Sequence, residues 1–178
     1  MKPKKYTVEA NKSISDTVLI DSEGNYSYSL HGPNGFVREW SGNYNNNTQY
    51  LASNIQYIPE NQSVQIHVGM CSLVEPCDKP MFRIVDNVYN SGGPWETNSS
   101  KEFIMNLSSS GNWYDFTVTS NCYPGQFLTR YMGRMETGHD SISDPAMANH
   151  VVENDVHPLL PEYITNQPNW WETYWWET

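Results

Sequence analysis

The feature that most constrains the fold is a series of short runs whose side chains alternate as they do in β-strands. Residues 26–30 (YSYSL) alternate large and small side chains, and residues 113–119 (WYDFTVT) give the strongest strand pattern in the chain. Turn signals rich in Gly, Pro and Asn separate such runs, as at residues 32–35 (GPNG). No stretch has the 3.6-residue apolar period of an amphipathic helix, so we expect little helix.

The expected strands fall into two groups, separated by a polar linker at residues 43–48. The expected extended runs are residues 6–9, 14–20, 26–30, 36–40, 54–58, 64–68, 81–89, 101–107, 113–119 and 126–132. Residues 24–30 align with residues 111–118, and residues 36–42 align with residues 127–133, which indicates an internal repeat. Chance similarity between two Gly-Asn-aromatic turns is the alternative.

The fold class that we predict is all-β, an antiparallel β-sandwich of the immunoglobulin-like kind. Residues 1–42 would be a partial module, the second half of the first repeat. Residues 43–147 would be a complete sandwich module, and residues 148–178 an acidic tail rich in tryptophan. A strand set as small as the first is marginal alone. We expect it to dock on the second module, with association with another copy or with missing upstream strands as the alternatives.

Composition and charge exclude some functions. The chain has 178 residues, of which 38% are hydrophobic and 17% charged, with a net charge of −10. An acidic chain repels phosphate backbones, so we do not expect nucleic-acid binding. The three cysteines, Cys71, Cys77 and Cys122, are an odd number; the first two could close a small disulfide loop, or all three could be reduced thiols.

Long motifs in this sequence resemble one protein family. They are YTVEANKSISDTVLIDSEGNYSYSLHGPNGFVREWSG at residues 6–42, GNWYDFTV at residues 111–118 and GRMETGHDSISDPAM at residues 133–147. These strings are similar to the C-terminal region of the bacterial phosphocholine-type phospholipases C, a region of two tandem β modules that follows the catalytic domain. The resemblance runs from about residue 4 to residue 147.

The resemblance implies an accessory role beside an upstream catalytic domain, which would be the partner of this chain. It also implies a first module without its opening strands, in a chain less stable and more prone to self-associate than an upstream-extended one. The parent enzyme would be secreted or periplasmic, although no signal peptide is visible after Met1.

No catalytic residue, metal ligand or cofactor site is predicted. The histidines are His31, His67, His139, His150 and His157, and none lies at the spacing of a known catalytic or zinc motif. Nor is there a nucleophile elbow or a phosphate-binding loop. A metal shared by His150, Asp155 and His157 is an alternative in a segment that prolines interrupt.

Two groups of residues could still have a role in binding or in structure. A possible choline-headgroup cage, or else ordinary strand packing, is formed by Tyr26, Tyr28, Trp40, Trp113 and Tyr114. A structural motif, or else an oxygen-ligand cation site, is formed by Gly138, Asp140, Ser141, Ser143, Asp144 and Pro145. We favour the structural role, in which short polar side chains bond nearby backbone and hold this segment across the sandwich. The terminal tryptophans could lie in a lipid interface, dock into a groove or belong to a disordered end.

The function expected from the sequence is that of a non-catalytic accessory region of a phospholipase C that acts on phosphatidylcholine or sphingomyelin. Such a region could shape substrate access, contact lipid headgroups or stabilise the enzyme. The alternative is a free-standing β-sandwich that binds a lipid headgroup, a carbohydrate or a protein. An independent hydrolase is the third hypothesis.

Overall fold

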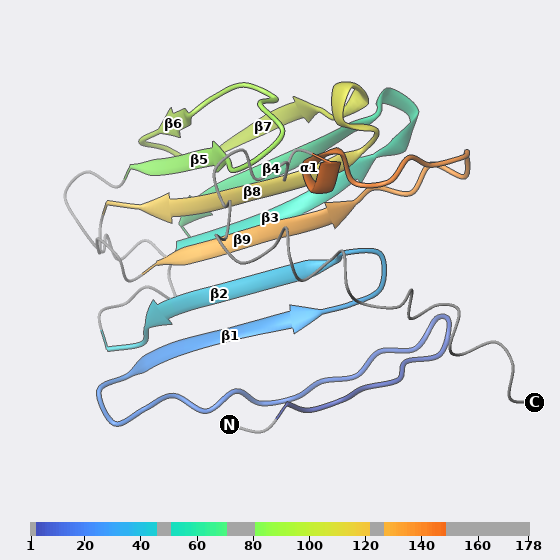
Figure 1. Ribbon diagram of the computed structural model, residues 1–178. Coiled ribbons are helices and arrows are strands. Elements are labelled where there is room, and N and C mark those ends of the chain that lie inside the picture. The colour runs from blue at the N-terminus through green and yellow to red at the C-terminus, as the bar shows by residue number, and fades with distance from the viewer. Residues whose placement is uncertain (1–2, 46–50, 71–80, 122–126, 149–178) are drawn as a thin grey trace, which may run out of the picture. The chain divides into compact units, whose positions relative to one another are not determined.

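The computed structural model describes residues 3–45, 51–70, 81–121 and 127–148, and nearly all of its regular structure is β-strand (Figure 1). The strands are β1 (Asn25–His31), β2 (Val37–Asn43), β3 (Leu51–Ile58), β4 (Ser63–Met70), β5 (Phe82–Asp86), β6 (Trp95–Thr97), β7 (Lys101–Asn106), β8 (Trp113–Ser120) and β9 (Leu128–Arg134). The helical pieces are η2 (Pro59–Asn61), η3 (Ser108–Ser110) and α1 (Pro145–Ala148).

The strands form two antiparallel sheets. One sheet has six strands in the order β1-β2-β9-β8-β5-β6, and the other has three strands in the order β3-β4-β7. Every pairing is antiparallel, as the predicted sandwich requires. Side chains from both sheets build one buried cluster, so the all-β sandwich class is confirmed.

The core comes from the period-2 pattern of the central strands. On β8, Tyr114, Phe116 and Val118 are all buried, and on β4 the same is true of Ile66 and Val68. Full burial of one such side chain stabilises the fold by about 1.5–3 kcal/mol. Trp113, by contrast, is only half-buried, since neighbours on a strand point to opposite faces. The predicted alternation of residues 113 and 114 is therefore confirmed.

The first group of strands continues the larger sheet. β2 pairs with β9 from Val37↔Met132 to Ser41↔Leu128, and β1 pairs in turn with β2. Figure 1 shows β1, β2 and β9 side by side, with residues 3–22 running beyond β1. The expected docking of the first segment on the second is thus confirmed, in the form of edge-to-edge strand pairing. The repeat and the module boundaries stay predictions; contacts group residues Met1–Pro145 as one compact unit.

Two of the expected extended runs are not strands. Residues 6–9 and 14–20 have no ladder partner in the described part of the chain, and their side chains are exposed. Asn11, at φ 61°, turns this segment back on itself, and the amide of Lys12 donates to the carbonyl of Glu9 at 3.0 Å. Strand propensity without a neighbouring strand does not make a sheet, which is why the prediction was wrong here.

The expected extended run at residues 81–89, for which the sequence also predicts a break near Asp86 and Asn87, is a strand only as far as Asp86. The carboxylate of Asp86 accepts hydrogen bonds from the amides of Val88, Tyr89 and Ser91 at 2.7–3.0 Å. This side-chain turn replaces the ladder bonds that would continue the strand. Although burial of Asp86 opposes it, the hydrogen bonds from Ser91, Val88 and Tyr89 lower the pKa of this carboxyl.

Several predictions lie outside the described residues: those on the three cysteines, His150, Asp155, His157 and the terminal tryptophans. In the part of the chain that the structure describes, no helix is both long enough and apolar enough to cross a bilayer.

Candidate functional site

The segment that follows β9 carries the most distinctive sequence motif, and three contacts fix its path. The amide of Met135, whose side chain is buried, donates to the carbonyl of Asn112 at 2.9 Å. The indole Nε1 of Trp113 donates to the carbonyl of Ile142 at 3.0 Å. The hydroxyl of Tyr89 donates to Asp144 at 2.8 Å. Between these anchors, residues 137–141 form a loop that belongs to no strand or helix.

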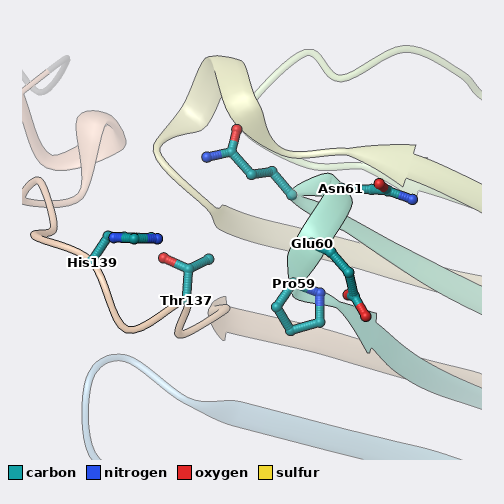
Figure 2. Close-up of a pocket in the computed structure, with 6 residues that line it drawn as sticks. Pro59, Glu60, Asn61, Thr137 and His139 are labelled. Carbon is teal, nitrogen blue, oxygen red and sulfur yellow. The ribbon is translucent and has the colours of Figure 1, made fainter.

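A polar hollow lies on one side of this loop (Figure 2). It measures about 400 Å³ and is lined by Pro59, Glu60, Asn61, Gln62, Thr137 and His139. Figure 2 shows Thr137 and His139 facing the 3-10 turn η2 across the hollow. The lining is mainly polar and includes one carboxylate and one imidazole.

A second hollow of about 260 Å³ lies on the other side of His139. Its lining is Asn34, Trp113, Arg134, Glu136, His139 and Ser141. These residues come from three places: the turn between β1 and β2, the start of β8, and the end of β9 with the loop after it. The three sequence motifs that carry the family resemblance therefore meet at this hollow.

Glu136 bonds two other side chains that line the second hollow. Its carboxylate accepts hydrogen bonds from Nη1 of Arg134 at 2.7 Å and from the side-chain amide Nδ2 of Asn34 at 3.3 Å. The Arg134 side chain is only 5% exposed, and its Nε has no hydrogen-bond partner among the described residues. The charges of Arg134 and Glu136 compensate each other, so the hollow presents both donors and acceptors without a net charge from this pair.

The structure separates the five aromatic residues of the predicted cage. Tyr28 stacks on its cross-strand partner Trp40 with ring centroids 5.1 Å apart, and Tyr26 lies 6.1 Å from Tyr28. Trp113 lines the second hollow instead. Tyr114 is buried, with 1% of its surface exposed. The five do not form one cage, and ligand contact by the three residues on β1 and β2 stays a prediction.

Arg38 provides a hydrogen-bond partner for the hydroxyl of the buried Tyr114. This arginine, 6% exposed, donates through Nη2 to the hydroxyls of Tyr57 and Tyr114 at 2.8 and 2.9 Å. Through Nη1 it donates to the carbonyls of Val37 and Met132 at 2.7 and 2.9 Å. Burial, together with the hydrogen bond to Tyr57, raises the pKa of Tyr114. The arginine thus joins β2, β9, β8 and β3.

A second polar cluster lies on the opposite face of the larger sheet. Asp115 is 2% exposed and accepts from Nε and Nη2 of Arg130 at 2.8 and 2.6 Å, and from Asn87 at 2.8 Å. Glu39 lies 3.5 Å from the same guanidinium. The hydrogen bond to Asp115 raises the pKa of Arg130. Each member of this cluster is bonded within the sheet, which is a structural arrangement.

Sequence reasoning missed Asp115 and Arg130. It had noted Arg38 beside a possible binding loop at residues 31–36, with packing over an aromatic ring as the alternative, and the Arg38 guanidinium lies 4.2 Å from the centroid of the Phe36 ring. A carboxylate inside the strongest apolar strand was the available signal for Asp115, since a buried acid needs a cationic partner. The predicted motif at residues 138–145 has Asp144 bonded to Tyr89, whereas Asp140, Ser141 and Ser143 are exposed. The described residues contain no group of three or more His, Cys, Asp or Glu side chains placed to hold a metal ion.

Comparison with known proteins gives matches of one kind. Residues 1–43 match the family model of the bacterial phospholipase C, C-terminal domain. The non-hemolytic phospholipase C of Pseudomonas aeruginosa is 35% identical over 155 residues, which is 82% of this chain and 22% of that enzyme. The hemolytic phospholipase C of the same bacterium is 30% identical over 147 residues, 78% of this chain and 20% of the enzyme.

A third relative comes from Burkholderia pseudomallei. Its non-hemolytic phospholipase C is 32% identical over 155 residues, 82% of this chain and 21% of the enzyme. The chain therefore spans about a fifth of the length of these curated relatives. The resemblance seen in the motifs is confirmed: residues 1–43 match the family of the bacterial phospholipase C, C-terminal domain, and most of the chain is similar to part of the phospholipases C.

Proposed function

We propose that this chain is a non-catalytic accessory region of a phospholipase C that acts on phosphatidylcholine or sphingomyelin. Phosphodiester hydrolysis would take place in a catalytic domain outside residues 1–178. The observation that carries the proposal is the match of residues 1–43 to the C-terminal domain of bacterial phospholipase C. The homology over about a fifth of each relative is consistent with one region of a longer enzyme.

Two carboxylates of this chain already accept hydrogen bonds from neighbouring groups, which supports a structural role. Asp115 is held by Arg130 and Asn87, and Asp86 is held by the turn that follows it. Hydrolysis of a phosphodiester needs a nucleophile activated by a base, or metal ligands that generate one. A carboxylate whose oxygens already accept hydrogen bonds from a guanidinium and an amide is poorly placed to accept a proton from a water or a substrate.

The partner in this proposal is the catalytic domain of the same enzyme, and the enzyme would be secreted or periplasmic. Contact with lipid headgroups is a further part of the proposal. It is supported by Tyr28 and Leu30 of β1, which are 38% and 45% exposed beside the half-buried Trp40. Aromatic side chains with a polar tip favour the membrane interface.

The test is a hydrolysis assay of the purified chain on phosphatidylcholine vesicles, with and without added divalent metal. We expect no release of phosphocholine above a buffer blank. Substitution of a single histidine or aspartate, such as His139→Ala or Asp140→Asn, then changes nothing. Turnover that one such substitution abolishes would overturn the proposal.

A further inference from the structure

We propose that the second hollow binds a neutral polyhydroxylated ring, such as a monosaccharide, a cyclitol or the terminal residue of a glycan. The inference does not depend on the accessory role, since the hollow belongs to this chain alone. It rests on the side chains that line the hollow, on how they are held and on their charges.

The first step concerns how the hollow is built. Asn34 reaches it from a turn in which it has the left-handed φ of 54°, and its amide contacts Glu136 across 102 residues of chain. Trp113 is fixed from behind by its bond to Ile142 and by the packing of Gly35, where a Cβ would lie 3.1 Å from the indole. Fixed groups lose little entropy on binding, so a small ligand can be held by them.

The second step concerns charge. A guanidinium and a carboxylate line the same small space, and they already bond each other at 2.7 Å. A free anion there would face Glu136, and a free cation would face Arg134, each at an unfavourable distance. A neutral hydroxyl is different, because it donates to a carboxylate and accepts from a guanidinium at the same time.

The last step concerns shape and class. Trp113 gives the hollow an indole wall, and aromatic rings attract the weakly positive C–H groups of a sugar ring through their negative faces. The amide of Asn34, the imidazole of His139 and the hydroxyl of Ser141 supply further polar groups around it. A volume of about 260 Å³ fits one ring rather than a long chain. The hollow beyond His139, lined by Glu60 and other polar groups, could take a second unit.

The experiment is nuclear magnetic resonance of the full chain with its indole N–H groups observed. The Trp113 signal is assigned from its loss in Trp113→Phe. The probes are glucose, galactose, mannose, N-acetylglucosamine and myo-inositol; choline chloride and sodium phosphate serve as charged comparisons. We expect at least one neutral ring to shift the Trp113 signal with a dissociation constant on the order of 1 mM, and neither charged probe to do so.

Matched variants locate the binding. Asn34→Gly keeps the left-handed backbone but removes the amide, and should weaken binding about tenfold. His139→Ala, in an exposed loop, should also weaken it. The control is Asn90→Gly, because Asn90 is an exposed residue with nearly the same φ, 55°, and lines neither hollow. It should bind like the parent chain, and melting curves check that all variants fold.

A second arm separates the sources of the ring. Retention of the chain on immobilised neutral glycans, without a response to free rings, would assign the site to a glycan end and support the proposal. A response to no ring and no glycan would overturn it, as would binding that Asn34→Gly and His139→Ala leave unchanged. Neither outcome bears on the proposed accessory role, which the hydrolysis assay tests separately.

Discussion

Replacement of Arg38 by methionine tests whether a buried guanidinium holds the first hairpin to the sandwich. Arg38 makes four hydrogen bonds, to the hydroxyls of Tyr57 and Tyr114 and to the carbonyls of Val37 and Met132. Each bond from a charged donor contributes about 1.5–3 kcal/mol. Their sum overstates the effect, because the described structure gives Arg38 no carboxylate partner and its desolvation costs several kcal/mol.

The balance of these effects gives an expected loss of about 2–4 kcal/mol for Arg38→Met. Tyr57 and Tyr114 can still bond each other, since their hydroxyls are 2.6 Å apart. For a unit of this size that loss lowers the melting temperature by roughly 5–15 °C. Arg38→Lys should cost at least as much, because an ammonium keeps the charge but cannot bond all four acceptors.

The assay is thermal unfolding followed by circular dichroism, with hydrogen exchange to locate the effect. We expect the amides of β1 and β2 to lose more protection than those of β4. The matched control is Arg83→Met, since Arg83 and Glu96 are 3.8 Å apart with side chains 54% and 48% exposed, and should change stability by less than about 0.5 kcal/mol. If Arg38→Met melts like the parent chain, the role assigned to the buried guanidinium is wrong.

Three further predictions use the same measurements. Asp115→Asn should lose about 2–3 kcal/mol, because Arg130 keeps its charge beside a neutral amide, and an unchanged melting temperature would contradict this. Tyr114→Ala should lower the free energy of unfolding by about 3–5 kcal/mol, and Trp113→Ala, at a half-buried position, should lower it clearly less. A larger loss for Trp113→Ala than for Tyr114→Ala would refute this. Burial raises the pKa values of Tyr89, Tyr114 and Tyr131 above the usual value of about 10, so unfolded but not folded phenols ionise above that pH. Their contribution to stability is thus complete below about pH 10 and falls as the pH rises toward the folded pKa values; urea unfolding curves and tyrosinate absorbance test this, and stability that rises with pH there would contradict it.

Much of the fold could be predicted because most strands have apolar side chains at alternate positions, which places those side chains on one face of a sheet. β4 and β8 are clear cases, with buried residues at alternate positions. The strand β6 was not predicted, since three residues are too few for a pattern to be seen. Residues 6–9 and 14–20 have strand-like composition, yet pairing depends on a neighbour that sequence alone does not supply.

The candidate site was harder to predict, because its residues are far apart in the chain. Asn34 and Glu136 meet only when β2 pairs with β9, and that pairing is a long-range event. The motifs that contain these residues were recognised, but their meeting at one hollow was not. For the aromatic residues, the prediction grouped side chains that the structure separates. They were placed in one cage because they are of the same type, whereas neighbours on a strand, such as Trp113 and Tyr114, point to opposite faces of the sheet.

The central claim, that this chain is an accessory region of a phospholipase C, is tested most directly by a chimeric enzyme in which this chain replaces the matching segment. The chain would replace the segment of the non-hemolytic phospholipase C of Pseudomonas aeruginosa to which it aligns over 155 residues. The measurement is the rate of phosphatidylcholine hydrolysis by the purified, folded chimera. We expect a rate close to that of the parent enzyme, since the proposal places the catalytic groups outside the exchanged segment. A folded chimera without hydrolysis would contradict the account.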